Sequence, residues 1–455
     1  MVDTSNETDK SVIVYGAGIS GCGAAEVLAE HGQKVFLYND KPCTIEPALL
    51  AALKAVGGDL VIGEEAFIQI LSNAGMLVLS PGVPCDNMNV RLAEAVSGVE
   101  VISEVELAYR LYDGHMAAIT GTNGKTTTTS IVGEMFKRLP VPSAVGGNIG
   151  LALSKEVNGL PENAWMAAEL SSFQLEKVTT FRPDIAVVLN LTPDHLERHH
   201  TMAAYGAAKK NIFRHQSMGQ VTVLNYDDPE VRSWAKESSG TICFFSRKNV
   251  LQEGIFIQNG NFVIKWNDTT RVVCNIDELQ LFGGHNEENV LAAIACGYFA
   301  HVPIEEMADV LRNFKSIEHR LEYVRTIKGV PYYNDSKATN TVSTNIALNA
   351  FDKPTILIMG GLDRGHSFEP LNNAMKNVKL VVCYGQTKGR IEKWANGLGI
   401  EVKVFDNLHD ATMYAASKAV AGDVVLLSPA CASWDQYKCF EDRGTEFKTI
   451  VNNLK

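Results

Sequence analysis

The chain lacks the features that mark secreted or membrane-bound proteins. No run of apolar residues approaches the roughly 20 that a membrane span requires. Residues 1–10 are polar and lack the apolar stretch of a signal peptide. The nine cysteines are scattered, odd in number and without a CxxC pair, which is typical of reduced thiols. We therefore expect a cytoplasmic protein without a membrane partner.

The sequence also lacks an excess of basic residues. Its 41 Lys and Arg face 52 Asp and Glu, a formal net charge of −11. Sequence-independent binding of nucleic acid needs a basic face, so we expect no nucleic-acid partner. With 46% hydrophobic and 20% charged residues, the composition is that of a globular protein with real cores. A length of 455 residues predicts about three domains.

Short apolar segments alternate with stretches of helical spacing, which predicts an α/β protein with parallel sheets. Residues 254–258 and 261–266 instead alternate like β-hairpins with Asn-Gly turns. We expect domains at 1–103, 104–316 and 317–455. The other predicted strands are 11–15, 34–38, 76–80, 116–119, 165–168, 185–190, 221–225, 330–334, 355–359, 380–384, 402–405 and 424–428.

The segment Gly121-Thr-Asn-Gly-Lys-Thr-Thr127 follows an apolar strand and opens a helical stretch. Backbone N–H groups of such a turn converge on an anion, and the helix N-terminus adds partial positive charge. Lys125 is placed to reach the outer phosphates of ATP, and Thr126 to offer its hydroxyl to Mg²⁺. The standard phosphate loop has glycine where this chain has Ile119. The alternative interpretation is an ordinary strand–turn–helix corner.

A second glycine cluster, Gly16-Ala-Gly-Ile-Ser-Gly21, follows the first strand, and Asp40 ends the second. This spacing fits a dinucleotide fingerprint and, taken alone, indicates an oxidoreductase using NAD or FAD. The same backbone chemistry serves the diphosphate of a UDP-sugar. We favour the UDP-sugar because the chain carries a separate ATP loop, which a dehydrogenase does not need.

Two further strand ends carry polar side chains. Glu169 ends one predicted strand, and Asp194 and His195 follow another. We expect these to be adjacent strand ends at the carboxyl edge of the sheet, where ligands bind. Carboxylate oxygens suit Mg²⁺. Taken singly, Glu169 could be a solvated strand end and His195 a surface histidine.

Further motifs occur along the chain, at Gly121 to Thr127, Gly146 to Gly150, Glu169 to Glu176, Asn190 to His199, Gly284 to Asn289, Glu318 to Arg320, Asn334 to Asn340 and Ser428 to Gln436. In these motifs the chain resembles the Mur ligases, which add amino acids to the peptidoglycan precursor. The third part resembles the members that add D-glutamate, whereas a sister Mur ligase or a folylpolyglutamate synthetase is the alternative. The resemblance implies a Rossmann-like N-terminal domain, a central P-loop ATPase-like parallel sheet with a small β-hairpin region, and a Rossmann-like C-terminal domain.

The resemblance also implies a reaction. ATP phosphorylates the carboxylate of UDP-N-acetylmuramoyl-L-alanine to an acyl phosphate, D-glutamate attacks with its amine, and ADP and phosphate leave. Mg²⁺ is the implied cofactor. Phosphorylation supplies the leaving group that a carboxylate lacks, and the protein positions and neutralises the transferred phosphoryl. This reaction belongs to the cytoplasmic synthesis of cell-wall precursors, which is needed for cell shape and cell division. We expect the protein to be a monomer.

The resemblance implies particular residues for the nucleotide and the metal. Lys209 matches the lysine that the family carries as a carbamate, with its neighbour Lys210 as the alternative. Implied metal ligands are Thr126, Glu169, His195 and carbamylated Lys209. Implied catalytic residues are Lys125, Asn148, His195, Lys209, Arg320 and Lys337. Implied ATP-binding residues are Gly121, Thr122, Asn123, Gly124, Lys125, Thr126, Thr127, Asn286, Asn289, Arg320 and Asp335.

It likewise implies residues for the two other substrates. Asn286 has a simpler alternative role as the cap of the helix that begins there. Relatives carry lysine in the Gly-Gly-x-x-Lys pattern where this chain has Arg364, so charge is kept while geometry changes. Implied D-glutamate residues are Thr339, Arg364, Ser433 and Phe440. Implied UDP-substrate residues are Gly18, Ile19, Ser20, Asp40, Lys41, Ser80, Pro81, Gly82, Asn148, Ser171 and Gln174.

Overall fold

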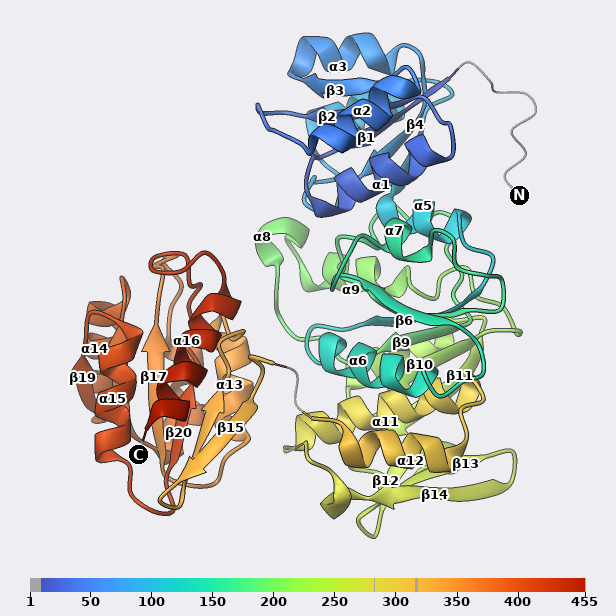
Figure 1. The fold of residues 1–455 in the computed structure, drawn as a ribbon. Coiled ribbons are helices and arrows are strands. Elements are labelled where there is room, and N and C mark those ends of the chain that lie inside the picture. Colours follow the sequence, from blue (N-terminus) through green and yellow to red (C-terminus); the bar gives the residue numbers. More distant parts are fainter. Residues whose placement is uncertain (1–9, 282, 316–317, 455) are drawn as a thin grey trace. The chain divides into compact units, whose positions relative to one another are not determined.

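A computed structural model describes residues 10–281, 283–315 and 318–454 (Figure 1). The chain forms two compact units, which are described separately. The first unit comprises the described residues up to Glu278 together with Glu287–Arg312, and the second comprises the described residues of 279–286 and from Asn313 onward. The predicted boundary between 103 and 104 stays a prediction, and the one between 316 and 317 falls on residues outside the described part.

The first sheet has five parallel strands in the order β3-β2-β1-β4-β5. Val12 and Val14 point to one core, under α1, α2 and α5, and Ile13 and Tyr15 to another, under α3 and α4. This confirms the predicted Rossmann-like arrangement. Its elements are β1 (Ser11–Tyr15), α1 (Ile19–Glu30), β2 (Val35–Asn39), α2 (Pro47–Ala55), β3 (Asp59–Ile62), α3 (Glu64–Leu71), β4 (Ala74–Leu79), α4 (Met88–Ala95), β5 (Glu100–Ser103) and α5 (Glu104–Arg110).

The second sheet has nine strands in the order β14-β13-β12-β11-β10-β9-β6-β8-β7. The strands are parallel from β7 to β12, and β12, β13 and β14 pair antiparallel. The strands are β6 (His115–Thr120), β7 (Ser143–Gly147), β8 (Trp165–Glu169), β9 (Ile185–Val188), β10 (Val221–Asn225), β11 (Thr241–Ser246), β12 (Gly254–Gln258), β13 (Asn261–Trp266) and β14 (Thr269–Asn275).

The hairpin region is confirmed, with one difference in its turns. Asn259 and Gly260 both have positive φ (51° and 73°), as a two-residue type I′ turn requires. The second turn is Asn267-Asp268 rather than Asn-Gly, and these residues also have positive φ (48° and 59°). Asn and Asp tolerate the left-handed region better than other residues with a Cβ, so both turns have the same conformation.

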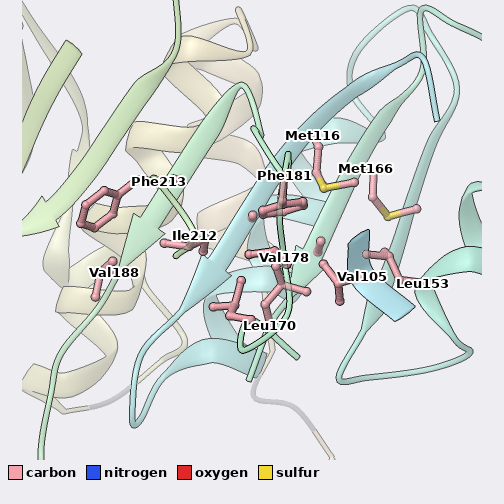
Figure 2. Close-up of a cluster of buried hydrophobic side chains, with 14 of the residues drawn as sticks. Val105, Met116, Leu153, Met166, Leu170, Val178, Phe181, Val188, Ile212 and Phe213 are labelled. Carbon is pink, nitrogen blue, oxygen red and sulfur yellow. The ribbon is translucent and has the colours of Figure 1, made fainter. Parts of the chain in front are cut away.

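Helices cover both faces of the second sheet. α6 packs on β7 and β8. On the other face, Met116, Phe181 and Ile212 belong to one buried apolar cluster (Figure 2). The helical elements are α6 (Lys125–Phe136), α7 (Leu153–Val157), α8 (Leu196–His199), α9 (Met202–Lys210), α10 (Pro229–Ser233), η1 (Trp234–Lys236), η2 (Ile276–Glu278), α11 (Gly284–Phe299) and α12 (Ile304–Asn313).

The third sheet forms the second unit and is doubly covered. Leu357 and Met359 of β17 enter one core with α13, η3 and α14, while Ile356 and Ile358 enter another with α15 and α16. Strand order is β15-β16-β20-β17-β18-β19, with only β15 antiparallel. The elements are β15 (Glu322–Ile327), β16 (Val330–Asn334), α13 (Thr341–Asn349), β17 (Thr355–Gly360), η3 (Glu369–Asn377), β18 (Val378–Tyr384), α14 (Lys388–Gly397), β19 (Glu401–Val404), α15 (Leu408–Lys418), β20 (Val424–Leu427) and α16 (Phe440–Asn453).

None of the helices in the described part of the chain has the length and apolar character needed to cross a bilayer. Six strands lie outside the predicted set: β3, β5, β7, β11, β14 and β15. β3, β7, β14 and β15 are wholly or partly exposed along their length, so their sequences lack the continuous apolar run of a strand buried on both faces.

A buried carboxylate ties α5 to the segment that follows β8. Glu106 is fully buried and accepts hydrogen bonds from the backbone N–H groups of Thr179 (2.9 Å), Thr180 (3.0 Å) and Phe181 (3.0 Å). Arg110 donates a further bond to it at 3.0 Å. Burial raises the pKa of Glu106, but these hydrogen bonds outweigh it and hold the pKa below the ordinary value of 4.5. The charged form is therefore the one that the fold stabilises.

We predict that Glu106→Gln lowers the free energy of unfolding by about 3 kcal/mol at pH 7, because an amide cannot accept so many bonds. A depressed pKa gives stability that is present above pH 4.5 and is lost as the pH falls below it. The difference between wild type and variant should therefore hold from pH 7 down to pH 4.5 and shrink when urea unfolding is repeated below pH 4.5. Glu100→Gln, on the exposed partner of the same Arg110, serves as control and should change stability little. Equal stability of wild type and Glu106→Gln at pH 7 would contradict the prediction.

Candidate active site

The candidate site lies where β6, β8 and β9 reach the carboxyl edge of the second sheet. The expectation that Glu169 and His195 follow adjacent strands is wrong, because β8 and β9 flank β6 on its two sides. Glu169 ends β8, and His195 lies beyond β9. The two segments therefore border, from opposite sides, the glycine loop that leaves β6.

The loop from Gly121 to Gly124 depends on glycine at both ends. Gly121 has φ 153° and Gly124 has φ 86°, conformations that disfavour a side chain. A Cβ on Gly124 would come within 2.1 Å of Oδ1 of Asn289. Asn289 is buried and lies against the loop, where it accepts a bond from Thr128 at 3.4 Å. Lys125 then begins α6, so the N-terminus of a 12-residue helix faces the loop.

Two lysine head groups meet at one carbonyl oxygen of this loop. Nζ of Lys125 donates to the carbonyl oxygens of Gly121 (2.9 Å) and Thr122 (2.8 Å). Nζ of Lys209 also donates to Gly121, at 2.8 Å. Lys209 is 1% exposed, and burial, helped by the charge of Lys125, lowers its pKa well below the usual 10.5. Its neighbour Lys210 is turned to the surface, where it pairs with Glu237.

Glu169 is a buried carboxylate with an unsatisfied oxygen. Its side chain is 2% exposed, so it is not the solvated strand end considered as an alternative. Oε1 accepts a bond from Nδ2 of Asn148 at 2.9 Å, whereas Oε2 is buried without a hydrogen-bond partner among the described residues. An orphaned carboxylate oxygen is costly unless a cation or another donor meets it. The hard oxygens of Glu169 and of the nearly buried Thr126 hydroxyl fit Mg²⁺.

His195 stands at the other border of the loop. Its backbone is left-handed (φ 53°), and its imidazole is 43% exposed. The ring lies 4.9 Å from that of Phe173 and 3.6 Å from a carboxylate oxygen of Asp194. The half-exposed ring thus lies between two carboxylates, since its other nitrogen is 3.6 Å from Glu197.

A cleft of about 560 Å³ opens beside Asn148, the hydrogen-bond partner of Glu169. Of the 11 residues that the resemblance implied for the UDP substrate, Lys41 and Ser171 do not line it. Gly16 cannot carry a Cβ without meeting Ser80 at 3.0 Å, and Asp40 accepts bonds from the hydroxyls of Tyr15 (2.7 Å) and Tyr38 (2.9 Å). The residues of the implied set that do line it are Gly18, Ile19, Ser20, Asp40, Ser80, Pro81, Gly82, Asn148 and Gln174.

The second unit carries further implied residues, several of them in the loops that follow β16, β17 and β20. Asp335 follows β16 and is buried; burial raises the pKa of its carboxyl to about 7, while bonds from Ser428 and the N–H of Leu321 oppose the shift. The Nζ of Lys337 lies 5.7 Å from the ring centre of Phe440. Implied residues in this unit are Asn286, Arg320, Asp335, Lys337, Thr339, Arg364, Ser433 and Phe440.

A buried arginine holds these three strand ends together. Arg443 of α16 is fully buried. It donates to the carbonyl oxygens of Ser336 (2.7 Å), Gly360 (3.4 Å) and Cys431 (3.0 Å). These residues follow β16, end β17 and follow β20, respectively. One side chain thus fixes the loops that carry Lys337, Arg364 and Ser433.

The alternative role of Asn286 as a helix cap is wrong. α11 begins at Gly284, so Asn286 lies inside its first turn. The residue is buried, and its backbone N–H donates to Gly283 at 2.9 Å. The helix starts earlier than its apolar pattern because Gly284 and His285 are not part of that pattern.

Comparison with known proteins agrees with this geometry. Residues 119–297 match the Mur ligase middle domain, and residues 319–431 match the Mur ligase glutamate ligase domain. A UDP-N-acetylmuramoylalanine--D-glutamate ligase of Lachnoclostridium phytofermentans is 40% identical over 453 residues, 99% of each chain. One from Clostridioides difficile is 41% identical over 98% of this chain and 99% of its own. The chain belongs to the Mur ligase family.

Solved structures of Mur ligases share the fold at low sequence identity. The UDP-N-acetylmuramate-alanine ligase of Thermotoga maritima superposes with a TM-score of 0.59 at 18% identity and covers 98% of this chain and 100% of its own. The MurF ligase of the same organism, solved in complex with ADP, has a TM-score of 0.58 at 16% identity, with 98% and 99% covered. The predicted three-domain α/β fold class is thereby confirmed.

One group in this Mur ligase was missed by the sequence reasoning. Arg198 of α8 donates to the carbonyl oxygens of Pro81 (3.2 Å) and Val83 (3.0 Å) and to Glu176 at 2.6 Å. Its guanidinium lies 4.5 Å from the ring centre of Phe173. It therefore ties the cleft wall that follows β4 to the segment bearing His195. Arg198 is inside the matched motif, but a lone arginine gives no sequence signal of such a contact.

We predict that Arg198→Ala loosens the cleft wall, because three hydrogen bonds to Pro81, Val83 and Glu176 are lost. Amide hydrogen exchange in residues 81–87, followed by mass spectrometry, should become at least about tenfold faster. The exposed Arg182 is a matched control, since Arg182→Ala should leave exchange in that segment unchanged. Unchanged exchange in Arg198→Ala would show that residues 81–87 keep their structure without this side chain.

Proposed function

We propose that the chain is an ATP-dependent ligase that joins D-glutamate to UDP-N-acetylmuramoyl-L-alanine through an acyl phosphate and releases ADP and phosphate. The curated relatives that are about 40% identical over the whole chain carry the name of this activity. One observation carries the proposal. Asn148 lines the 560 Å³ cleft and also donates to Glu169 beside the nucleotide loop. The acid to be activated and the phosphoryl donor would thus meet at one side chain.

In this proposal the nucleotide loop holds the triphosphate. Backbone N–H groups of residues 121–127 and the N-terminus of α6 face its negative charge. Lys125 moves from its carbonyl partners to the outer phosphates and neutralises charge on the transferred group. Asn289, Asn286, Arg320 and Asp335 complete the ATP set. Asn148 orients the acceptor, and Lys337 with Arg320 adds positive charge.

Mg²⁺ would be held by Thr126, Glu169, His195 and Lys209. When bound, the ion neutralises phosphate charge. Lys209 suits its part because a neutral buried amine, unlike an ammonium, attacks CO₂ with its lone pair to give a carbamate after loss of a proton. The lowered pKa of Lys209 favours that neutral form. The carbamate oxygens convert a cationic residue into an anionic ligand.

The remaining substrates have separate sites in this proposal. The UDP-linked substrate occupies the cleft with its diphosphate near Gly18, Ile19 and Ser20, and residues 1–103 form its domain. Residues 104–316 bind ATP, and residues 317–455 bind D-glutamate with Thr339, Arg364, Ser433 and Phe440. Lys41 and Ser171 complete the UDP set although they do not line the cleft. We propose a cytoplasmic monomer.

The decisive experiment measures phosphate release from Mg-ATP with purified protein and UDP-N-acetylmuramoyl-L-alanine. D-Glutamate, L-alanine, L-lysine and meso-diaminopimelate are offered in turn. Release only with D-glutamate supports the proposal. Release with another amino acid would favour a sister ligase, and a bound nicotinamide absorbance without ATP turnover would favour the dinucleotide interpretation of the first glycine cluster.

We predict that Lys125→Ala reduces phosphate release to background, since the charge on the transferred phosphoryl loses its neutralising partner. Binding of UDP-N-acetylmuramoyl-L-alanine, measured by calorimetry, should stay within about threefold of wild type, because the cleft lining does not include Lys125. Lys210→Ala removes a nearby surface lysine as control and should keep turnover. A Lys125→Ala enzyme with normal turnover would exclude the loop as the phosphate site.

We predict that Lys209→Ala also loses turnover, but in a way that added acid repairs. A short carboxylate such as acetate would occupy the space of the carbamate and supply oxygen ligands. Phosphate release should therefore rise with acetate concentration in Lys209→Ala and not in Lys125→Ala. Failure of every short acid to restore activity would contradict the carbamate role.

A further inference from the structure

Two loops of the second unit are joined in register. The loop after β17 and the loop after β20 form an isolated antiparallel bridge between Leu362 and Ala432, with the N–H of Leu362 donating to Ala432 at 2.9 Å. A Cβ on Gly361 would lie 2.2 Å from the carbonyl oxygen of Ala432. His366 adds a bond to the carbonyl oxygen of Ala430 at 3.1 Å. The bridge holds the two loops close together, and two residues that lie beyond it also contact each other.

Those residues are Arg364 and Trp434. The guanidinium carbon of Arg364 lies 4.7 Å from the centre of the Trp434 ring. Trp434 is 63% exposed, which is unusual for so large an apolar side chain. Among the residues that the structure describes, Arg364 makes no hydrogen bond and no ion pair. The indole face therefore supports the guanidinium while all its N–H donors stay available.

The neighbouring carboxylate is engaged elsewhere. Asp363 forms an ion pair with Arg390 and accepts a bond from the N–H of Gly365 at 2.9 Å. Arg390 is itself fixed by a bond to the carbonyl oxygen of His366 at 2.7 Å. Arg390 thus pairs with the carboxylate that would otherwise neutralise the charge of Arg364. The positive charge beside Trp434 remains for a ligand.

We propose that Trp434 is a positioning residue that holds the Arg364 guanidinium over its indole ring and presents it to a carboxylate of the incoming amino acid. The inference rests on the proposed function and adds a specificity residue to it. Ser433, buried next to Trp434 on the same loop, belongs to the implied D-glutamate set. A planar fork binds a carboxylate with two parallel hydrogen bonds, and stacking fixes the plane of that fork.

The pairing suits an arginine at position 364 better than it would suit a lysine. An ammonium is a compact point charge that does not need a flat support. A guanidinium on a flexible stem loses rotational freedom when it binds, and an aromatic face restricts that freedom beforehand. Arg364 and Trp434 therefore act as one unit, and each is useful only with the other.

The test compares KM values for D-glutamate in the full-length enzyme. Trp434→Leu keeps apolar bulk without a π face and should raise this KM by on the order of tenfold, with KM for ATP and for the UDP-linked substrate within about twofold. Trp434→Phe restores an aromatic face and should recover most of the loss. Lys418→Met removes the cation of a second cation–π pair in the same unit and should change nothing.

A double variant tests whether the two residues act together. Arg364→Lys should raise the KM for D-glutamate by a similar factor, and adding Trp434→Leu should raise it little further. D-Glutamine and D-isoglutamine, each lacking one carboxylate, identify the group that Arg364 holds: wild type should reject one of them, and the double variant should reject it less. Additive losses, or an unchanged KM in Trp434→Leu, would overturn the inference. Absence of D-glutamate turnover in wild type would overturn the proposed function and this inference with it.

Discussion

Two lysine head groups on the carbonyl oxygen of Gly121 impose the main constraint on this protein. Both lysines are held at the same loop, and Lys209 is almost wholly buried. Like charges so placed repel, and burial removes the water that would screen them. The two amines can stay this close only if one of them loses its proton or if an anion binds beside them. Glycine at 121 and 124 permits the positive φ values of this short turn, and Asn289 packs closely against Gly124.

The buried carboxylate of Glu169, with its unpaired oxygen, has the opposite charge to the two lysines. It lies at the end of β8, on one side of the loop, while His195 lies beyond β9 on the other. Asn148 connects Glu169 to the cleft, and Arg198 connects the cleft wall to the His195 segment. These part-buried hydrogen bonds tie the lining of the cleft to the two segments that border the loop.

Strongly apolar strands such as β1, β6 and β17 could be predicted from the sequence because both of their faces are buried. The edge strands β3, β14 and β15 could not, since water on one side permits polar residues there. The Asn-Gly turn was predictable from its backbone demands, whereas Asn267-Asp268 meets the same demands with a weaker signal.

The candidate site was predictable to a similar, limited extent. The motifs pointed to Lys125 and Glu169. The order of strands along the chain, however, does not reveal that β6 lies between β8 and β9 in the sheet. It likewise does not tell which of Lys209 and Lys210 is buried, because adjacent helical residues differ only in direction. The role of Arg198 could not be predicted, because its partners are backbone carbonyl groups of Pro81 and Val83, far away in the sequence.

The second unit separates a rigid frame from variable chemistry. Arg443 fixes the ends of β16, β17 and β20 through backbone carbonyl groups, so the side chains beyond those ends are free to differ while their positions are kept. Arg364 and Trp434 stand on two such loops, joined by the Leu362–Ala432 bridge. Replacing a point charge by a guanidinium at this place requires a flat support, and the facing loop supplies one. Arg364 and Trp434 are thus placed by the backbone frame, and their side chains determine how a carboxylate would be bound there.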